Sequence, residues 1–515
     1  MNGAESLVRS FVGAGVDVCF ANPGTSEMHL VQAIDAVPEM RAVLTLFEGV
    51  CTGAADGYAR MRGVPALTLL HLGPGLANGI ANLHNARRAA TPLINVVGNH
   101  ALYHIDYDAP LTSDIDTLAR NVSSWIKSDS TAATLASDGM AALQASLTAR
   151  AGSAGQIASL IVPVDACWSD AQGVASPLAP PAPPAVGADR VQAIAAQLDG
   201  DSVIVLDGAG LSPEAQVDAA RAGHVSGARV VFSTFPARTD GGPGSPRIDK
   251  LPYFPEHVLA SLAGVKRMVL AGAATPVSFF AYPDMPGELV PEGCAVHTLA
   301  AGDEDVAKAL ADLADALDAP SGGYAVHEIG SQNPGTGRLT TRSVAACLAM
   351  RMPEGSVFCG DSGGGGAAFA PTQQAGSNTW LNLTGGSIGQ GGPAAVGAAV
   401  ACPDRQVFAL LGDGASMYTI QALWTQAREK LDVITVIFSN RTYGILETEY
   451  RRLGVNEVGD RAAALFDLSR PDLDFSSLAQ GMGVNGVRTD TVEAFDKALT
   501  DALEAGGPHL IEALV

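Results

Sequence analysis

Two apolar runs, residues 407–411 and 433–438, flank a segment with helical spacing, and they constrain the fold of this 515-residue chain more than any other feature. Each run has the length and composition of a buried strand, and the apolar residues of 418–427 fall on one helical stripe. Strands joined through a helix run parallel in one sheet, with their carboxyl ends at the same edge. The segment therefore predicts a strand-helix-strand unit of a parallel sheet.

Polar residues follow both predicted strands at that edge. Asp413 lies in a Gly-Asp-Gly turn after the first strand, and Asn440 follows the second. Carboxylate and amide oxygens, completed by a carbonyl of the turn 440–444, suit a hard cation such as Mg²⁺. Gly414 lets a phosphate approach the N-terminus of the following helix. The tripeptide alone is better explained as an ordinary capped turn, but the strand context and Asn440 favour a metal-diphosphate site.

Two further segments each allow a functional and a structural interpretation. Glu48 follows the apolar run 42–47 and opens a predicted helix, so it is either a partly buried carboxyl suited to proton transfer or a first-turn acid that favours the helix dipole. Four glycines, 363–366, follow the predicted strand 356–359. They form either a second phosphate cradle, because successive glycines expose backbone amides, or a flexible surface loop.

Composition narrows the classes of partner and compartment. The net charge of -22 argues against binding to nucleic acid or anionic membranes. A diphosphate remains compatible, because a bound divalent ion neutralises it locally. The seven cysteines include no CxxC pair and several lie in apolar runs, which indicates free thiols in a reducing compartment. Without a signal peptide or a stretch of 18 apolar residues, we expect a cytoplasmic protein.

Loop-rich stretches divide the chain into three segments. Residues 176–184 form a proline-rich linker, and residues 319–337 are rich in Gly and Pro. Each segment alternates short β-rich runs with helical patterns, which predicts an α/β fold with three domains, each an open, mostly parallel sheet flanked by helices. We expect these domains at 1–175, 186–318 and 338–515.

Four motifs in a fixed order resemble the thiamine diphosphate (ThDP) enzymes of the acetolactate synthase, benzoylformate decarboxylase and pyruvate decarboxylase superfamily. One motif is the predicted metal edge, which contains Asp413 and Asn440. The other three are residues 20–27, the pair of segments 47–49 and 54–60, and the pair of segments 385–389 and 393–397. The resemblance implies pyrimidine-binding, central and diphosphate-binding domains, with ThDP and Mg²⁺ as cofactors. Some relatives bind FAD in the central domain. The glycine-rich turn 207–212 lacks the spacing of a dinucleotide site, so the sequence does not require FAD.

The resemblance also implies roles for individual residues. Glu48 matches the glutamate that hydrogen-bonds the cofactor's aminopyrimidine and promotes proton removal from the thiazolium ring. Gly386 would offer a carbonyl to the aminopyrimidine, and Ile388 would form the apolar wedge that bends the cofactor. The remaining cofactor-binding candidates are Gly363, Gly364, Asp413, Gly414, Ala415, Asn440 and Tyr443, and the metal-ligand candidates are Asp413, Asn440 and Thr442.

Residues expected on the substrate side of the site do not decide to which branch of the superfamily the chain is more similar. His71 matches the single pocket histidine of the benzoylformate decarboxylase branch, and Thr25 stands where that branch has a substrate-contacting serine. Phe280, however, falls by a loose alignment where the branch has its second pocket histidine. Without the resemblance, a lone histidine at a strand end is more often structural.

We expect an acetolactate-synthase-like carboligase that decarboxylates a 2-oxo acid and joins the acyl carbanion to a second carbonyl compound. A non-oxidative 2-oxo acid decarboxylase of the benzoylformate decarboxylase type is the close alternative, and a catalytically silent ThDP-binding partner of a synthase is another. The resemblance implies a homodimer or homotetramer with active sites at the subunit interface, where Glu48 of one chain faces the metal edge of the next.

Overall fold

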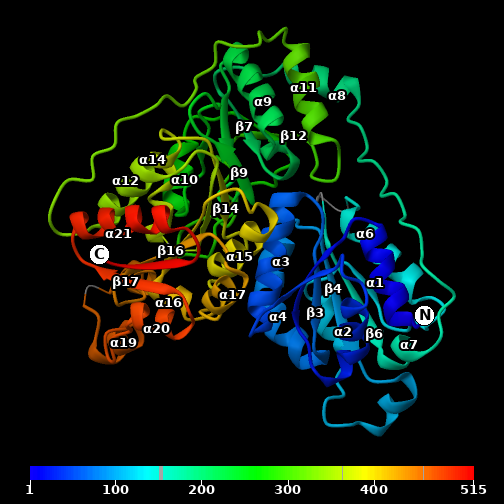
Figure 1. The fold of residues 1–515 in the computed structure, drawn as a ribbon. Helices are drawn as coiled ribbons and strands as arrows, with labels where there is room; N and C mark the ends of the chain where they lie inside the picture. Colours follow the sequence, from blue (N-terminus) through cyan, green and yellow to red (C-terminus); the bar gives the residue numbers. More distant parts are fainter. Residues whose placement is uncertain (150–154, 362, 456) are drawn as a thin grey trace.

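Three sheets flanked by helices make up the protein in a computed structural model that describes residues 1–149, 155–361, 363–455 and 457–515 (Figure 1). All pairs within the first two sheets are parallel, and the third has a single antiparallel pair at its edge. The predicted α/β class with mostly parallel sheets is therefore confirmed. Residues 176–184 are exposed and contain no helix or strand.

The first sheet has the strand order β2-β1-β3-β4-β6-β5. Its strands are β1 (Val18–Asn22), β2 (Arg41–Leu44), β3 (Leu67–Leu70), β4 (Leu93–Asn99), β5 (Trp125–Lys127) and β6 (Ile157–Pro163). Helices α1 (Gly3–Gly13), α2 (Met28–Asp35), α3 (Glu48–Arg62), α4 (Leu72–Arg88) and α6 (Leu135–Leu147) cover it. Both faces are buried: Phe20 of β1 belongs to one apolar cluster, and its neighbours Cys19 and Ala21 belong to another.

The second sheet has the order β10-β8-β7-β11-β12. It is built from β7 (Ser202–Leu206), β8 (Arg229–Phe232), β10 (Asp249–Lys250), β11 (Arg267–Ala271) and β12 (Ala295–Ala300). The helices of this part are α8 (Ala188–Ala195), α9 (Pro213–Ser226), α10 (Pro255–Ser261) and α11 (Val306–Ala316).

The third sheet has the order β17-β18-β16-β15-β13-β14-β9. Its strands are β13 (Ser356–Gly360), β14 (Asn378–Asn382), β15 (Val407–Gly412), β16 (Val433–Ser439), β17 (Asn485–Thr489), β18 (His509–Leu514) and β9 (Arg238–Gly241). Helices α12 (Thr341–Arg351), α15 (Gly391–Ala401), α17 (Ala422–Glu429), α20 (Phe475–Gly481) and α21 (Val492–Ala505) belong to it. Strand β9 comes from the middle of the chain and runs antiparallel to β14.

The strand-helix-strand unit of the third sheet is confirmed, because β15 and β16 pair in parallel with Val407 opposite Val433. The helix begins later than its apolar spacing predicts, at Ala422. Residues just before it form turns, and the Thr419 hydroxyl donates a 2.7 Å hydrogen bond to the carbonyl of Gly389. This hydrogen bond ties Thr419 to a distant loop, so the residues before Ala422 do not continue the helix. The local apolar spacing carries no sign of such a contact.

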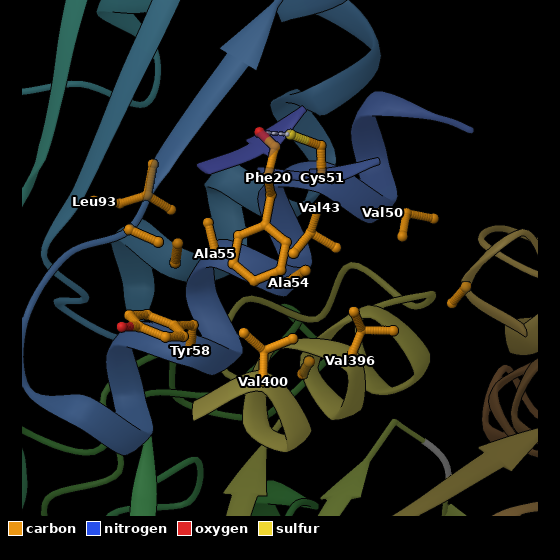
Figure 2. Close-up of a cluster of buried hydrophobic side chains, with 14 of the residues drawn as sticks. Phe20, Val43, Val50, Cys51, Ala54, Ala55, Tyr58, Leu93, Val396 and Val400 are labelled. Carbon is orange, nitrogen blue, oxygen red and sulfur yellow. Dashed lines mark hydrogen bonds between the residues drawn. The ribbon is translucent and has the colours of Figure 1, made fainter. Parts of the chain in front are cut away.

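Helices α3 and α15 join the first and third sheets through glycines. A side chain at Gly57 would overlap the Ala394 carbonyl, and one at Gly397 would overlap that of Ala54. Val396 and Val400 of α15 share one apolar cluster with Phe20 and the alanines of α3 (Figure 2). The close approach of these two helices fixes how the two cofactor-related sheets sit against each other.

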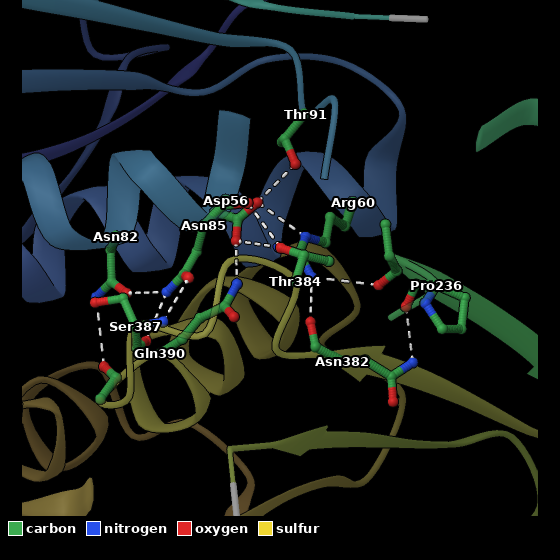
Figure 3. A network of polar contacts seen from close by, with 12 residues as sticks. Asp56, Arg60, Asn82, Asn85, Thr91, Pro236, Asn382, Thr384, Ser387 and Gln390 are labelled. Atoms are coloured by element: carbon green, nitrogen blue, oxygen red, sulfur yellow. Dashed lines mark hydrogen bonds and ion pairs between the residues drawn. The ribbon is translucent and has the colours of Figure 1, made fainter. Parts of the chain in front are cut away.

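A buried ion pair ties all three parts of the chain together (Figure 3). Arg60 donates to both carboxylate oxygens of Asp56 at 2.7 and 2.9 Å. Its remaining donors reach the carbonyls of Asn382, at 2.7 Å, and Ala237, at 3.2 Å. Asp56 also accepts hydrogen bonds from Thr91 and Gln390. Because both charges are fully hydrogen-bonded, the pair can remain buried and orient the three segments.

Five of the seven cysteines are buried and the other two are partly buried, and all seven are free thiols. Burial raises the pKa of the Cys19 thiol to about 12. This agrees with the expectation of unreactive thiols in apolar surroundings. In the part of the chain that the structure describes, no helix is long and apolar enough to cross a bilayer.

Candidate active site

The carboxyl ends of β15 and β16 bring Asp413 and Asn440 to one edge, as the topology predicts. Asp413 is 4% exposed, and its two carboxylate oxygens accept the backbone N–H groups of Gly414, at 2.8 Å, and Arg441, at 2.6 Å. The amide oxygen of Asn440 accepts the N–H of Thr442 at 3.1 Å. Burial raises the pKa of Asp413, so a divalent cation here would compensate by favouring the charged carboxylate.

The donors at this edge fit a hard cation. They are one carboxylate, one amide oxygen and the carbonyl of Thr442, all oxygen ligands of the type that such ions prefer. Among the described residues there is no group of three or more His, Cys, Asp and Glu side chains arranged to hold a metal. The expected set has a single carboxylate, so any further ligands would come from the cofactor and water.

Three glycines at the same edge differ in the space beside them, and of these only Gly363 adjoins open space that could admit part of a diphosphate. A side chain at Gly414 would overlap the ring of Tyr443, which therefore closes over the start of the short helix α16 (Asp413–Ser416) beside the buried Ala415. A Cβ on Gly364 would lie 2.9 Å from the Phe438 ring at the end of β16, whereas the space beside Gly363 is open. Residues Gly363–Gly366 form a short helical turn, α13, and their role as a phosphate cradle stays a prediction. Ser362 of this motif lies outside the described residues.

The segment that contains Gly386 and Ile388 is held by a carboxylate for which the sequence analysis proposed no role. Gly386 has φ of +76°, and Ile388 is half-buried. One oxygen of Asp361 accepts the N–H groups of Gly389 and Gly391, each at 3.1 Å, and its other oxygen has no hydrogen-bond partner among the described residues. Burial raises the pKa of Asp361 to about 6. Asp361 follows strand β13 just as Asp413 follows strand β15. This shared position is the sequence signal from which a role for Asp361 could have been predicted.

Glu48 begins helix α3 directly after the extended residue Phe47. Its side chain accepts one hydrogen bond, 3.0 Å from the Asn78 amide, and the residue is 6% exposed. A Cβ on Gly75 would lie 3.3 Å from both the free carboxylate oxygen of Glu48 and the Cβ of His71. A glycine in the first turn of α4 therefore leaves space next to Glu48, where one carboxylate oxygen can bind a ring nitrogen of the expected cofactor.

His71 is oriented by a fully buried carboxylate. Its Nδ1 lies 2.8 Å from Oε2 of Glu27 and 3.2 Å from the Ser26 hydroxyl. Glu27 also accepts the Gly24 N–H at 2.7 Å and the Ser26 hydroxyl at 2.6 Å. Thr25, the hydroxyl expected in the pocket, is exposed and has no side-chain hydrogen bond among the described residues. Ser26, its neighbour, is the hydroxyl that reaches His71.

Aromatic rings gather over the segment that contains Gly386. Phe279 would lie 2.5 Å from a Cβ at Gly386, and its ring packs against Phe235 and Tyr253 at centroid distances of 5.5 and 5.4 Å. Phe280, the residue aligned with a pocket histidine, is 54% exposed and packs on the outer side of Phe279. The structure therefore places Phe279, rather than Phe280, next to the expected cofactor-bending segment.

The site residues form two groups within one chain. The metal edge and Gly386 belong to the third sheet, whereas Glu48, His71 and Glu27 belong to the first. No hydrogen bond or ion pair between described residues joins Glu48 to the metal edge. Helix α4 contacts both groups, because Asn85 donates a 2.8 Å hydrogen bond to the carbonyl of Ser387.

Comparison with known proteins identifies the family of the chain. Residues 1–124 match the model of the thiamine pyrophosphate enzyme N-terminal TPP binding domain, and residues 359–513 match that of the C-terminal TPP binding domain. The chain is 50% identical over 522 residues to a Mycobacterium tuberculosis protein named "Putative acetolactate synthase large subunit IlvX", covering 100% of this chain and 99% of that one. It is 28% identical to a Pseudomonas aeruginosa benzoylformate decarboxylase, covering 97% of this chain and 96% of that enzyme.

Solved structures show the same fold over the full length. The structure of a Rhodococcus jostii thiamine diphosphate-dependent 4-hydroxybenzoylformate decarboxylase superposes with a TM-score of 0.84 at 25% identity, and covers 100% of this chain and 99% of its own. A Polynucleobacter necessarius benzoylformate decarboxylase also has a TM-score of 0.84, at 20% identity, with the same coverage of both chains. With both binding domains matched and a full-length relative at 50% identity, the chain belongs to the thiamine pyrophosphate enzyme family, in the group of acetolactate synthases and benzoylformate decarboxylases.

Proposed function

We propose that this protein is a ThDP- and Mg²⁺-dependent decarboxylase that releases CO₂ from a 2-oxo acid and returns a proton to the carbon that carried it. The observation that carries the proposal is the Glu27–His71 pair, because a histidine held through Nδ1 by a buried carboxylate is suited to proton transfer at its other nitrogen. The sequence favoured carboligation, with decarboxylation as the close alternative. The proposal reverses the order of these two activities.

Each group of residues has a separate task in this proposal. When bound, ThDP supplies the electron sink for loss of CO₂. Asp413, Asn440 and the carbonyl of Thr442 would hold Mg²⁺ next to the diphosphate. The Glu48 oxygen that has no partner among the described residues would hydrogen-bond a ring nitrogen of the pyrimidine.

His71 acts on the substrate side. The imidazole donates its Nδ1–H to Glu27, so Nε2 is the nitrogen that exchanges a proton with the reacting carbon. Because Glu27 accepts three hydrogen bonds and has no exposed surface, the ring has one preferred orientation. The side chains of Phe279 and Phe235 would exclude water from the cofactor side and favour donors with an apolar substituent.

We further propose that the active site is completed by a second copy of the chain. The separation of Glu48 from the metal edge within one chain supports this, since both must contact one cofactor. Mixing Glu48→Gln and Asp413→Ala chains, each inactive alone, should restore activity at about one site in four after random reassortment into dimers. If mixing leaves the samples inactive although dimers exchange, both residues act within one chain.

Carboligation is the second candidate, favoured by the name of the relative at 50% identity. The deciding experiment is turnover of a panel of 2-oxo acids, including pyruvate and benzoylformate, with ThDP and Mg²⁺ and with products identified by NMR. An aldehyde as the main product, lost in His71→Phe, would support the proposal. Acetolactate or another acyloin as the main product would support ligation, and absence of CO₂ release by the ThDP-bound protein would contradict both.

A further inference from the structure

A cavity of about 370 Å³ lies at the edge of the second sheet, and none of its lining residues belongs to the proposed active site. It opens beside strands β8 and β10 and the end of helix α10, and its polar lining includes Arg229, Arg247, Lys250 and Asp249. Three cations and one carboxylate thus face one space in a protein whose net charge is -22. A cavity of this volume is large enough for a small metabolite.

The three cations have no acidic partners of their own. Within the described ranges, neither Arg229, Arg247 nor Lys250 forms an ion pair or a side-chain hydrogen bond to the protein. Like charges around one cavity repel one another unless an anion occupies it. The planar guanidinium groups are suited to the paired oxygens of a phosphoryl group, and an ammonium group adds a point charge.

Lys250 is the most constrained of the three. It is half-buried at the end of β10, and its ammonium group lies 4.3 Å from the centroid of the Phe369 ring. Burial lowers the pKa of Lys250 to about 8. A lysine that loses hydration without gaining a carboxylate is stabilised in its charged form when an anion binds next to it.

Lys250 also connects the cavity to the proposed cofactor site. Phe369 starts the short helix α14 (Phe369–Thr372), which follows the glycine turn α13 by two residues. The Phe369 ring packs on Trp380 at 5.4 Å, and Trp380 stacks on Phe358 of β13 at 4.9 Å. An anion that draws Lys250 away from Phe369 would therefore act on a residue that adjoins the glycine turn in the chain.

We propose that this cavity is a binding site for a phosphoryl-bearing small molecule, and that its occupancy changes the affinity of the protein for ThDP. The binding site is inferred from the cavity and from its three cations, which form no ion pair among the described residues. The coupling rests on the proposed function, because it requires a cofactor at the glycine turn.

Binding is tested by calorimetry with two probes, inorganic phosphate and a nucleoside monophosphate, on protein saturated with ThDP and Mg²⁺ so that the diphosphate site is filled. Lys250→Met keeps the side-chain stem against Phe369 and removes the charge, and Arg247→Met serves as the second variant if the first fails to fold. Lys266→Met is the matched control, because Lys266 is a well-exposed lysine of the same sheet, paired with Asp201.

We expect saturable binding of at least one probe, weakened about tenfold or more by Lys250→Met or Arg247→Met and unchanged by Lys266→Met. Tighter binding of the nucleoside monophosphate would identify a phosphate ester as the occupant, and tighter binding of phosphate would identify the free ion. Equal affinities in the variants and the control, or no saturation by either probe, would overturn the site.

The coupling is measured separately, as the dissociation constant of ThDP with and without the probe. It should change in the wild type and in Lys266→Met but not in Lys250→Met, and the reciprocal change should appear in probe affinity. Probe binding with an unchanged ThDP affinity would refute the coupling alone. If the protein does not bind ThDP at all, the proposed function fails, and probe binding to Asp413→Ala still tests the cavity.

Discussion

Replacing Glu27 by Gln tests the proposed role of His71 without changing the shape of the site. Glu27 is fully buried and accepts hydrogen bonds from His71, Gly24 and Ser26 at 2.8, 2.7 and 2.6 Å. Gly24 and His71 bond the same oxygen of Glu27, Oε2, whereas Ser26 bonds Oε1. A glutamine oxygen at the Oε2 position still accepts from both Gly24 and His71, and its amide nitrogen donates to the Ser26 hydroxyl. His71 then keeps its Nδ1–H tautomer but loses the negative charge that stabilises its protonated form.

A positioned acid-base group contributes roughly 10²–10⁴-fold to a rate, so we expect kcat to fall by about that factor in Glu27→Gln. The loss of one charged partner should lower stability by only about 1–3 kcal/mol. The assays are CO₂ release from the preferred 2-oxo acid across a pH series, ThDP binding by calorimetry, and the His71 tautomer by nitrogen NMR. ThDP affinity should stay within about twofold of the wild type, because Glu27 lies on the substrate side.

Glu5→Gln is the control, because Glu5 pairs with Arg9 on the surface of α1. It should leave all three readouts unchanged. A kcat in Glu27→Gln within about twofold of the wild type would refute the proposed role of the Glu27 charge. A fall in kcat that matches a loss of ThDP binding would show that Glu27 is structural.

Three further predictions concern the metal edge, the helix contact and a buried carboxyl. Asp413→Ala should abolish Mg²⁺-dependent ThDP binding in calorimetry, and unchanged affinity would reject the metal assignment. Gly397→Ala forces a methyl into the Ala54 carbonyl and should destabilise the protein by at least about 1–3 kcal/mol, whereas Gly13→Ala, with open space around it, should not lower the melting temperature. Burial raises the pKa of Asp361 from 3.8 to about 6, so folding favours its protonated form. The stability of the wild type relative to Asp361→Asn is therefore highest below pH 3.8 and falls by about 3 kcal/mol as pH rises past 6. Thermal unfolding of both proteins from pH 4 to 8 measures this difference, which a constant offset would contradict.

The elements nearest the metal edge were predictable because their signals are local. The apolar runs before Asp413 and Asn440 are long enough to identify two buried strands, and topology then brings both residues to one edge. The position of Glu48, at the junction of an apolar run and a helix, is also a local signal. Its expected catalytic role came from the resemblance, because the pattern alone equally allowed a first-turn acid.

The features that the sequence did not reveal depend on contacts between distant segments. Strand β9 is a polar run, Arg-Thr-Asp-Gly, and it becomes a strand by pairing with β14, where Asp240 accepts a 2.6 Å hydrogen bond from Thr379. Glu27 orients a histidine 44 residues away. Phe279 reaches Gly386 from the loop between β11 and β12, and no periodicity distinguishes it from Phe280.

The central claim is that Glu48 activates a bound thiamine cofactor, and the exchange rate of the cofactor's C2 proton in Glu48→Gln tests it most directly. Holoenzyme is mixed with deuterium oxide, quenched, and analysed by proton NMR, with ThDP binding verified by calorimetry. Glu48→Gln should bind ThDP with an affinity close to that of the wild type and exchange the C2 proton about 10²-fold or more slowly. An exchange rate equal to that of the wild type, with ThDP bound in both proteins, would contradict the account.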